Sequence, residues 1–255
     1  MDFTFWQYLA ICVLVALAGF VDSIAGGGGL ISLPAYFAIG LPPHAALATN
    51  KFSSVCGTSF AVLRYWRAGA VSIRAGLAAA AGALFGSALG ARLALAVSAE
   101  AINTMMLVLV PLVLAVFLLR AGATGRPGKG RGAKGGVMAA SAAIGAVVGA
   151  YDGFFGPGTG TFMAIGFSVI LGFGLLTSEA NARLANLASN AGAVAVFLVA
   201  GKVLFPLALY AAAAGIAGNL IGSRLAIRRG ARIIRPLTII VLVLLMGEIV
   251  RRRWL

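Results

Sequence analysis

Long apolar runs separated by short polar connections dominate the chain. Five runs precede a basic, glycine-rich stretch near the middle, and five follow it. A helix rises about 1.5 Å per residue, so about 20 apolar residues cross a hydrocarbon core about 30 Å thick. We therefore predict an all-α, polytopic membrane protein. The expected segments are 5–24, 30–40, 43–63, 71–91, 101–119, 136–151, 159–176, 180–200, 203–223 and 236–250.

Two glycine-rich motifs interrupt these runs, AGGGGL at 25–30 and FFGPGTG at 154–160. Glycine continues a helix poorly because of its backbone freedom, and Pro157 lacks an N–H group. We expect broken or re-entrant helices at both motifs, with the short segment 30–40 as a half-helix. The free N–H groups of such a half-helix can hold an anion, although small residues serve helix packing equally well.

The two motifs belong to an internal repeat. Asp22 is matched by Asp152 at an offset of 130 residues, and Lys51 by Arg183 at an offset of 132. GSALGARLAL from Gly86 matches GNLIGSRLAI from Gly218 at that second offset. We predict a first transmembrane repeat at 1–120, a linker at 121–135 and a second repeat at 136–255. Five segments per half is an odd number, so the second repeat is expected to be inverted.

Composition and charge agree with a membrane protein. Hydrophobic residues make up 61% and charged residues 10% of the chain, against about 45–50% and about 25% in soluble domains. The net charge of +14 lies mainly in short connections, which argues against nucleic-acid binding. With the linker in the cytoplasm, thirteen cations fall inside and five outside, as expected for the inner membrane. The outward RRRWL terminus fits this topology poorly.

Charged groups within the membrane are costly, so each is a functional candidate. They are Asp22, Asp152, Lys51, Arg183 and, just before Arg183, Glu179. Lys51 starts a stripe at i, i+3 and i+7 on one helix face, and Arg183 starts a second. The stripes continue with Ser54 and Thr58, and with Asn186 and Asn190. Hydrogen bonding between helices is the alternative explanation for these polar groups.

The sequence gives little support for enzyme, disulfide or metal chemistry. Cys12 and Cys56 form no CxxC pair, and the chain has no His/Glu metal pattern and no GxSxG motif. We expect no enzyme activity, no cofactor and no metal. His44 is expected to be a solvated or capping residue. Helix packing is expected for the glycine pairs Gly86 and Gly90, Gly218 and Gly222.

GFVDSIAGGGGLISLPAYFAIGLPPHAALATNKF, LANLASN and GNLIGSRLAIRRGARIIRPL together resemble the signatures of the TauE/SafE family of sulfite and organosulfonate permeases, most closely the YfcA-like branch. The resemblance covers nearly the whole chain. It implies a multi-span carrier for small sulfur-containing anions, often acting in export. Family members commonly have lysine in a T-K pair where Ala182 and Arg183 stand here. Arginine keeps the charge and suits oxyanions, so the difference bears on selectivity.

The resulting hypothesis is a permease in the lipid bilayer that moves a sulfur oxyanion by alternating access. Its expected substrate-binding residues are Asn50, Lys51, Ser54, Thr58, Arg183, Asn186, Asn190, Gly26, Gly27, Gly28, Gly29, Gly156 and Gly158. Asp22 and Asp152 are expected either to neutralise the cations in the empty state or to carry a coupling proton. The alternatives are a passive anion channel and a membrane assembly factor without a transported solute. The sequence leaves the anion, the direction, the coupling ion and the oligomeric state open.

Overall fold

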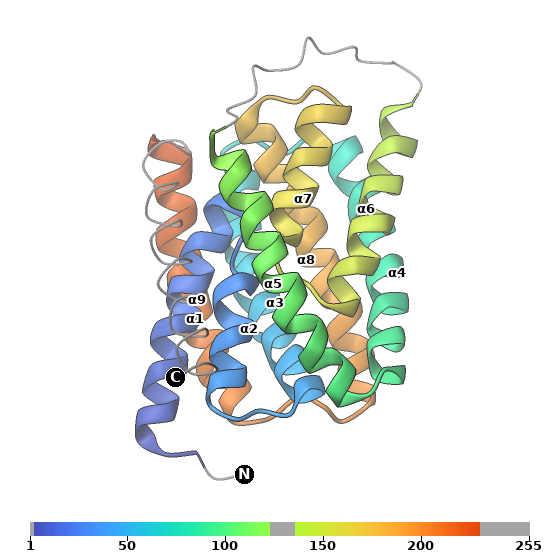
Figure 1. Cartoon of the computed structure of the whole chain (residues 1–255). Coiled ribbons are helices and arrows are strands. Elements are labelled where there is room, and N and C mark those ends of the chain that lie inside the picture. Colours follow the sequence, from blue (N-terminus) through green and yellow to red (C-terminus); the bar gives the residue numbers. More distant parts are fainter. Residues whose placement is uncertain (1–2, 123–135, 230–255) are drawn as a thin grey trace.

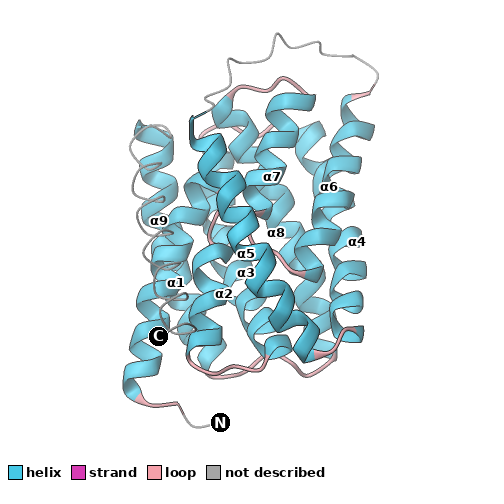
Figure 2. Ribbon diagram, viewed as in Figure 1, coloured by secondary structure: helices cyan, strands magenta, loops and turns pink. Residues whose placement is uncertain are grey.

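The computed structural model describes residues 3–122 and 136–229, and the regular elements within these ranges are all helical (Figures 1 and 2). They are α1 (Phe5–Ala25), α2 (Gly29–Ala38), α3 (Pro43–Arg67), α4 (Ile73–Ala96), α5 (Ala99–Gly122), α6 (Val137–Phe154), α7 (Thr159–Ile165), a π-helical segment (Gly166–Ile170), α8 (Leu175–Val199) and α9 (Leu207–Arg229). The all-α, polytopic prediction is confirmed. The expected segment 236–250 and most of the linker 121–135 lie outside the described residues.

Both predicted helix breaks are present. Ten-residue α2 is about 15 Å long, roughly half of a hydrocarbon core. The expected segment 159–176 was wrong as a single helix, because α7 has seven residues and passes into the π-helical segment. That segment ends before Gly172, whose positive φ of 69° is incompatible with a continuing helix. In Figure 1, α2 occupies the lower part of the molecule and α7 the upper part.

Helix α1 begins at a signal that is local in the sequence. The side chain of Thr4 accepts a hydrogen bond from the Gln7 backbone, and the Gln7 side chain accepts one from the Thr4 N–H at 2.8 Å. This reciprocal capping satisfies two N–H groups that a helix start otherwise leaves unpaired.

The helices form two bundles, and each bundle contains one helix from the other half of the sequence. Helix α9 packs along α1 and α3, and α4 packs along α6 and α8. One bundle therefore contains α1, α2, α3 and α9, and the other α6, α7, α8 and α4. Figure 1 shows α1 and α9 at one edge and α4 and α6 at the other. Helices α3 and α8 pack against each other between the two bundles.

Small residues hold the exchanged helices close to their partners. A Cβ on Gly86 or Gly90 would collide with the backbone of α6, and one on Gly218 or Gly222 with the backbone of α1. Such contact allows van der Waals packing between helix backbones, which is a main source of helix association in lipid. The predicted packing role of these four glycines is confirmed.

The outer surface is apolar. Four described helices, α1, α4, α6 and α8, have the length and hydropathy of membrane spans. Large side chains such as Phe85, Leu89 and Leu93 on α4 face outward. Polar side chains instead gather inside, where Lys51 and Arg183 are among the largest fully buried residues. This inside-out distribution is that of a protein whose surroundings are lipid.

Candidate functional site

The first glycine motif turns the chain from α1 into α2 around Asp22. Gly26 has a φ of 81°, and its N–H donates to the Asp22 carbonyl at 3.0 Å. The Gly28 N–H donates to the Asp22 carboxylate at 3.3 Å. A Cβ on Gly28 would collide with the Asp22 side chain. Glycine at both positions therefore lets the chain wrap around its own aspartate.

The second glycine motif does the same at the end of α6. Gly156 and Gly158 have positive φ values of 102° and 80°, and the chain reverses into α7. The Thr159 hydroxyl closes the turn by donating to the Gly156 carbonyl at 2.7 Å. Asp152, in the last turn of α6, accepts a hydrogen bond from the Ser189 hydroxyl of α8 at 2.6 Å.

Each aspartate pairs with the cation of the opposite half. Lys51 Nζ lies 2.6 Å from Asp152 Oδ1, and Arg183 Nη1 lies 3.4 Å from Asp22 Oδ1. The glycine of each motif also lies next to the cation of the opposite half. A Cβ on Gly156 would lie 3.1 Å from Lys51 Nζ, and a Cβ on Gly26 would lie 2.7 Å from Arg183 Nη2. Both ion pairs therefore cross the boundary between the two helix bundles.

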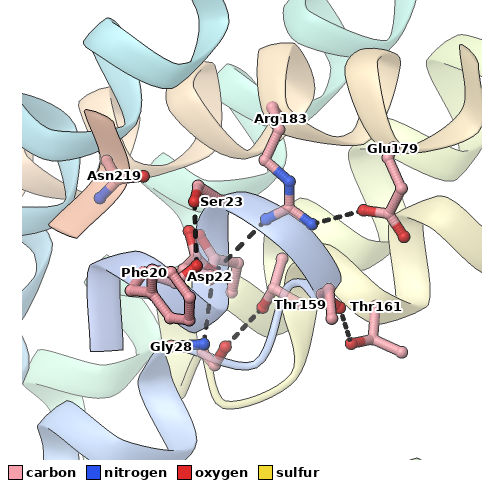
Figure 3. Close-up of polar contacts among 12 residues, drawn as sticks. Phe20, Asp22, Ser23, Gly28, Thr159, Thr161, Glu179, Arg183 and Asn219 are labelled. Carbon is pink, nitrogen blue, oxygen red and sulfur yellow. Dashed lines mark hydrogen bonds and ion pairs between the residues drawn. The ribbon is translucent and has the colours of Figure 1, made fainter. Parts of the chain in front are cut away.

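A third carboxylate distinguishes the two pairs. Arg183 Nη2 donates to Glu179 Oε2, one helical turn earlier on α8, at 2.9 Å. Figure 3 shows the guanidinium between Glu179 and Asp22. Arg183 Nη1 is close to Asp22 without the alignment of a hydrogen bond, and Nε meets no acceptor among the described residues. Arg183 is thus held mainly by its own helix.

These charges are removed from solvent. Lys51 is 2% exposed and Arg183 is 0% exposed. Moving an ion from water into a protein interior costs several kcal/mol, and only a nearby counter-ion with further hydrogen bonds offsets this cost. Lys51 therefore depends on Asp152 of the other bundle, and Arg183 depends on Glu179 together with Asp22.

A polar cavity lies beside the ion pairs, between the ends of the broken helices. It offers about 40 Å³ to the centres of water molecules, which is room for about three waters. Seven helices contribute to its wall: α1, α2, α3, α6, α7, α8 and α9. Most of the predicted site residues line it, namely Asp22, Gly26, Gly28, Gly29, Asn50, Lys51, Ser54, Thr58, Asp152, Gly156, Asn186 and Asn190.

Three predicted residues do not line the cavity. Arg183 is absent from the wall, although its guanidinium lies against Asp22 and Gly26, which line the cavity. Gly27 and Gly158 are also absent from the wall. In addition, the N–H groups of Gly26 and Gly28 are already bonded to Asp22. Of the two predicted cations, Lys51 is therefore the one that faces the cavity.

The sequence missed part of the wall. Ser32, Ser53, Thr159, Gly160 and Asn219 also line the cavity. The repeat could have identified Asn219 as a candidate, because it matches Ser87 of the first half and both are buried polar residues. The carbonyl oxygen of its side chain and the hydroxyl of Thr58 have no hydrogen-bond partner among the described residues.

The structure also describes the remaining residues that the sequence singled out, His44 and the two cysteines. His44 Nε2 lies 3.1 Å from the carbonyls of Ala94 and Val97, so it binds the C-terminal end of α4. Cys12 and Cys56 are free thiols. Over residues 3–122 and 136–229, no three His, Cys, Asp or Glu side chains gather as metal ligands.

Apolar outer surfaces, broken helices and a buried charged cavity together define a polytopic helical membrane protein of the transporter class. The chain matches the family Sulfite exporter TauE/SafE over residues 11–249. It therefore belongs to the TauE/SafE family.

Curated relatives are named as membrane transporters. A probable membrane transporter protein, ORF9 of Sinorhizobium sp., is 37% identical over 94% of this chain and 91% of its own length. YfcA of Escherichia coli K12, another probable membrane transporter protein, is 37% identical over 88% of this chain and 82% of its own. A probable membrane transporter protein of Haemophilus influenzae is 34% identical over 92% of this chain and 91% of its own length. No solved structure matches the chain. The family and its relatives are transporters rather than enzymes.

Proposed function

We propose that this protein is a secondary carrier that moves a small sulfur-containing oxyanion, such as sulfite, thiosulfate or an organosulfonate, across the inner membrane. The observation that carries the proposal is the buried cavity where Lys51 meets the glycine breaks of both halves. A cation at a polar cavity in a TauE/SafE protein matches the charge of such a substrate.

Anion binding at this cavity would compete with Asp152 for Lys51. The hydroxyl and amide side chains on the same wall, Ser54, Thr58, Asn186 and Asn190, can donate further hydrogen bonds to oxyanion oxygens. The cavity has room for about three water molecules, which a bound oxyanion would displace. Binding to Lys51 would lengthen its ion pair with Asp152.

Alternating access would come from rocking of one bundle against the other. The moving bodies would then be the exchanged bundles, α1 with α2, α3 and α9 against α4 with α6, α7 and α8, rather than the two sequence halves. The proposed inverted repeat is supported by the reciprocal exchange of α4 and α9 and of the two ion pairs. A cytoplasmic linker at 121–135 remains part of this proposal on the strength of its cations.

The test is uptake of labelled sulfite, thiosulfate and methanesulfonate into proteoliposomes. We expect saturable uptake that the other anions inhibit and that accelerates in counterflow. Lys51→Gln is expected to reduce the flux at least about a hundredfold, because a buried cation contributes several kcal/mol to holding an anion. Lys202→Gln, which changes an exposed lysine, is the matched control.

Lys51→Gln also leaves Asp152 without its counter-ion, so Lys51→Gln/Asp152→Asn serves as a second variant that removes the whole pair. Retained flux in this folded double variant would refute the assignment of Lys51. Flux without saturation or counterflow would instead identify a passive channel, and no flux of any anion would favour an assembly factor.

A further inference from the structure

We propose that the two aspartates have different roles: Asp22 carries a coupling proton, and Glu179 is the positioning residue that leaves Asp22 free to do so. This inference rests on the proposed anion transport and specifies its coupling. Its basis is the unequal way in which the two buried cations are neutralised.

Asp152 is held as a permanent counter-ion. Its two carboxylate oxygens are engaged separately, one by Lys51 Nζ at 2.6 Å and the other by the Ser189 hydroxyl at 2.6 Å. A short ion pair with a cation and a hydrogen bond from a hydroxyl stabilise the ionised carboxylate. A proton on Asp152 would displace one of these donors.

Asp22 is held much more loosely. Arg183 makes its aligned hydrogen bond with Glu179 at 2.9 Å, whereas its contact with Asp22 is longer, at 3.4 Å, and not aligned. Within the part of the chain that the structure describes, the remaining partner of the Asp22 carboxylate is the Gly28 N–H at 3.3 Å. Asp22 also lines the cavity, which neither Arg183 nor Glu179 does.

The buried charges around Asp22 are not balanced when Asp22 is ionised. The groups around Asp22 are Arg183 and Glu179 of α8, Lys51 of α3, Asp152 of α6 and the hydroxyl of Tyr65, also on α3. Glu179 neutralises Arg183 and Asp152 neutralises Lys51, so an ionised Asp22 is one negative charge in excess. A substrate anion in the same cavity would be repelled by it, because like charges at short range disfavour joint ionisation.

A proton on Asp22 removes this repulsion. The protonated carboxyl has an O–H that can donate to the anion or to a cavity water, and Arg183 remains neutralised by Glu179. Proton and anion therefore bind together and cross together. Without Glu179, Asp22 would be the remaining counter-ion of Arg183 and would stay ionised.

The first experiment compares Glu179→Gln, Asp22→Asn and the double variant in proteoliposomes, with Glu100→Gln as the control at an exposed acid on α5. The probe is labelled thiosulfate or methanesulfonate, because neither changes its charge near neutral pH. In the wild type and the control, an inward proton gradient should drive accumulation of the anion.

Asp22→Asn should keep saturable exchange but lose gradient-driven accumulation. Glu179→Gln should raise the half-saturating anion concentration at least about tenfold, and Asp22→Asn added to it should restore the lower concentration. A merely structural role of Glu179 predicts no such rescue. Wild-type accumulation in Glu179→Gln would overturn the proposal.

Direct proton counting tests Asp22 even if Glu179→Gln fails to fold. Purified protein in weakly buffered solution with a pH indicator should take up about one proton per bound anion, and Asp22→Asn should take up none. If the wild type transports the anion but Asp22→Asn still takes up the proton, this inference alone fails. If the wild type shows no saturable flux of any sulfur oxyanion, the proposed function fails and the inference fails with it.

Discussion

The two ion pairs occupy equivalent repeat positions but differ in their surroundings. The Lys51 pair is short and is supported by Ser189, and no second carboxylate of residues 3–122 or 136–229 pairs with Lys51. The Arg183 pair is long, and the cation is shared with Glu179. At the position of Glu179 the first half has Leu47. At the position of Ser189 the first half has Gly57, which offers no hydroxyl. Several differences between the halves therefore separate a fixed counter-ion from a loosely held one.

The largest difference between the two pairs is expected when each aspartate is neutralised. Asp152→Asn removes the counter-ion of Lys51 and should lower the free energy of unfolding by about 3–5 kcal/mol. Asp22→Asn should cost less than about 2 kcal/mol, because Arg183 keeps its hydrogen bond with Glu179. Thermal or denaturant unfolding in detergent measures both. Equal losses would contradict the unequal pairing.

The two left-handed glycines next to the cations are also expected to differ. Gly26→Ala and Gly156→Ala share a backbone penalty of about 1–2 kcal/mol. A Cβ at Gly26 also collides with the backbone of Gly160 and Thr161, whereas a Cβ at Gly156 meets first the flexible end of Lys51. Gly26→Ala should therefore be the more destabilising by about 1–3 kcal/mol, as for other overpacked interiors.

Gly40→Ala isolates the backbone penalty, because Gly40 has a φ of 88° and no atom within 4 Å of the added Cβ. Its loss of unfolding free energy should be close to that of Gly156→Ala. A loss as large as that of Gly26→Ala would show that the collision at the first motif adds nothing.

A further difference is expected at Ser189, the residue that supports only the Lys51 pair. Ser189→Ala removes a hydrogen bond to an ionised carboxylate and should cost about 1.5–3 kcal/mol in unfolding free energy. Ser59→Ala removes a hydroxyl that bonds a carbonyl within its own helix at 2.7 Å and is the control. Equal effects of both changes would show that Ser189 contributes no more than an ordinary helical serine.

Much of the fold was predictable from local patterns. Helices α1, α2, α3, α4 and α8 follow the expected segments closely, since apolar length and glycine or proline breaks are local properties. The expected segment 159–176 was divided by a π-helical turn, because its run of apolar residues gives no sign of a change in helical pitch. The inversion of the second repeat and the domain boundaries stay predictions.

The candidate site was predicted less evenly. The i, i+3, i+7 stripe placed Lys51, Ser54 and Thr58 together on one wall, because that spacing is a property of the helix itself. Arg183 starts the matching stripe but does not line the cavity. Asn219 joins the wall through the packing of α9 on α1 and α3, which no spacing within α9 reveals.

The sequence by itself determined that this chain is an apolar, multi-span TauE/SafE protein with charged residues at two matched glycine breaks. Those features depend on composition, periodicity and the backbone limits of glycine and proline. The tertiary structure alone decided that α4 and α9 exchange bundles and that each cation meets the aspartate of the other half. Such pairings depend on which helix surfaces pack closely, and small residues on helices far apart in the sequence decide that jointly.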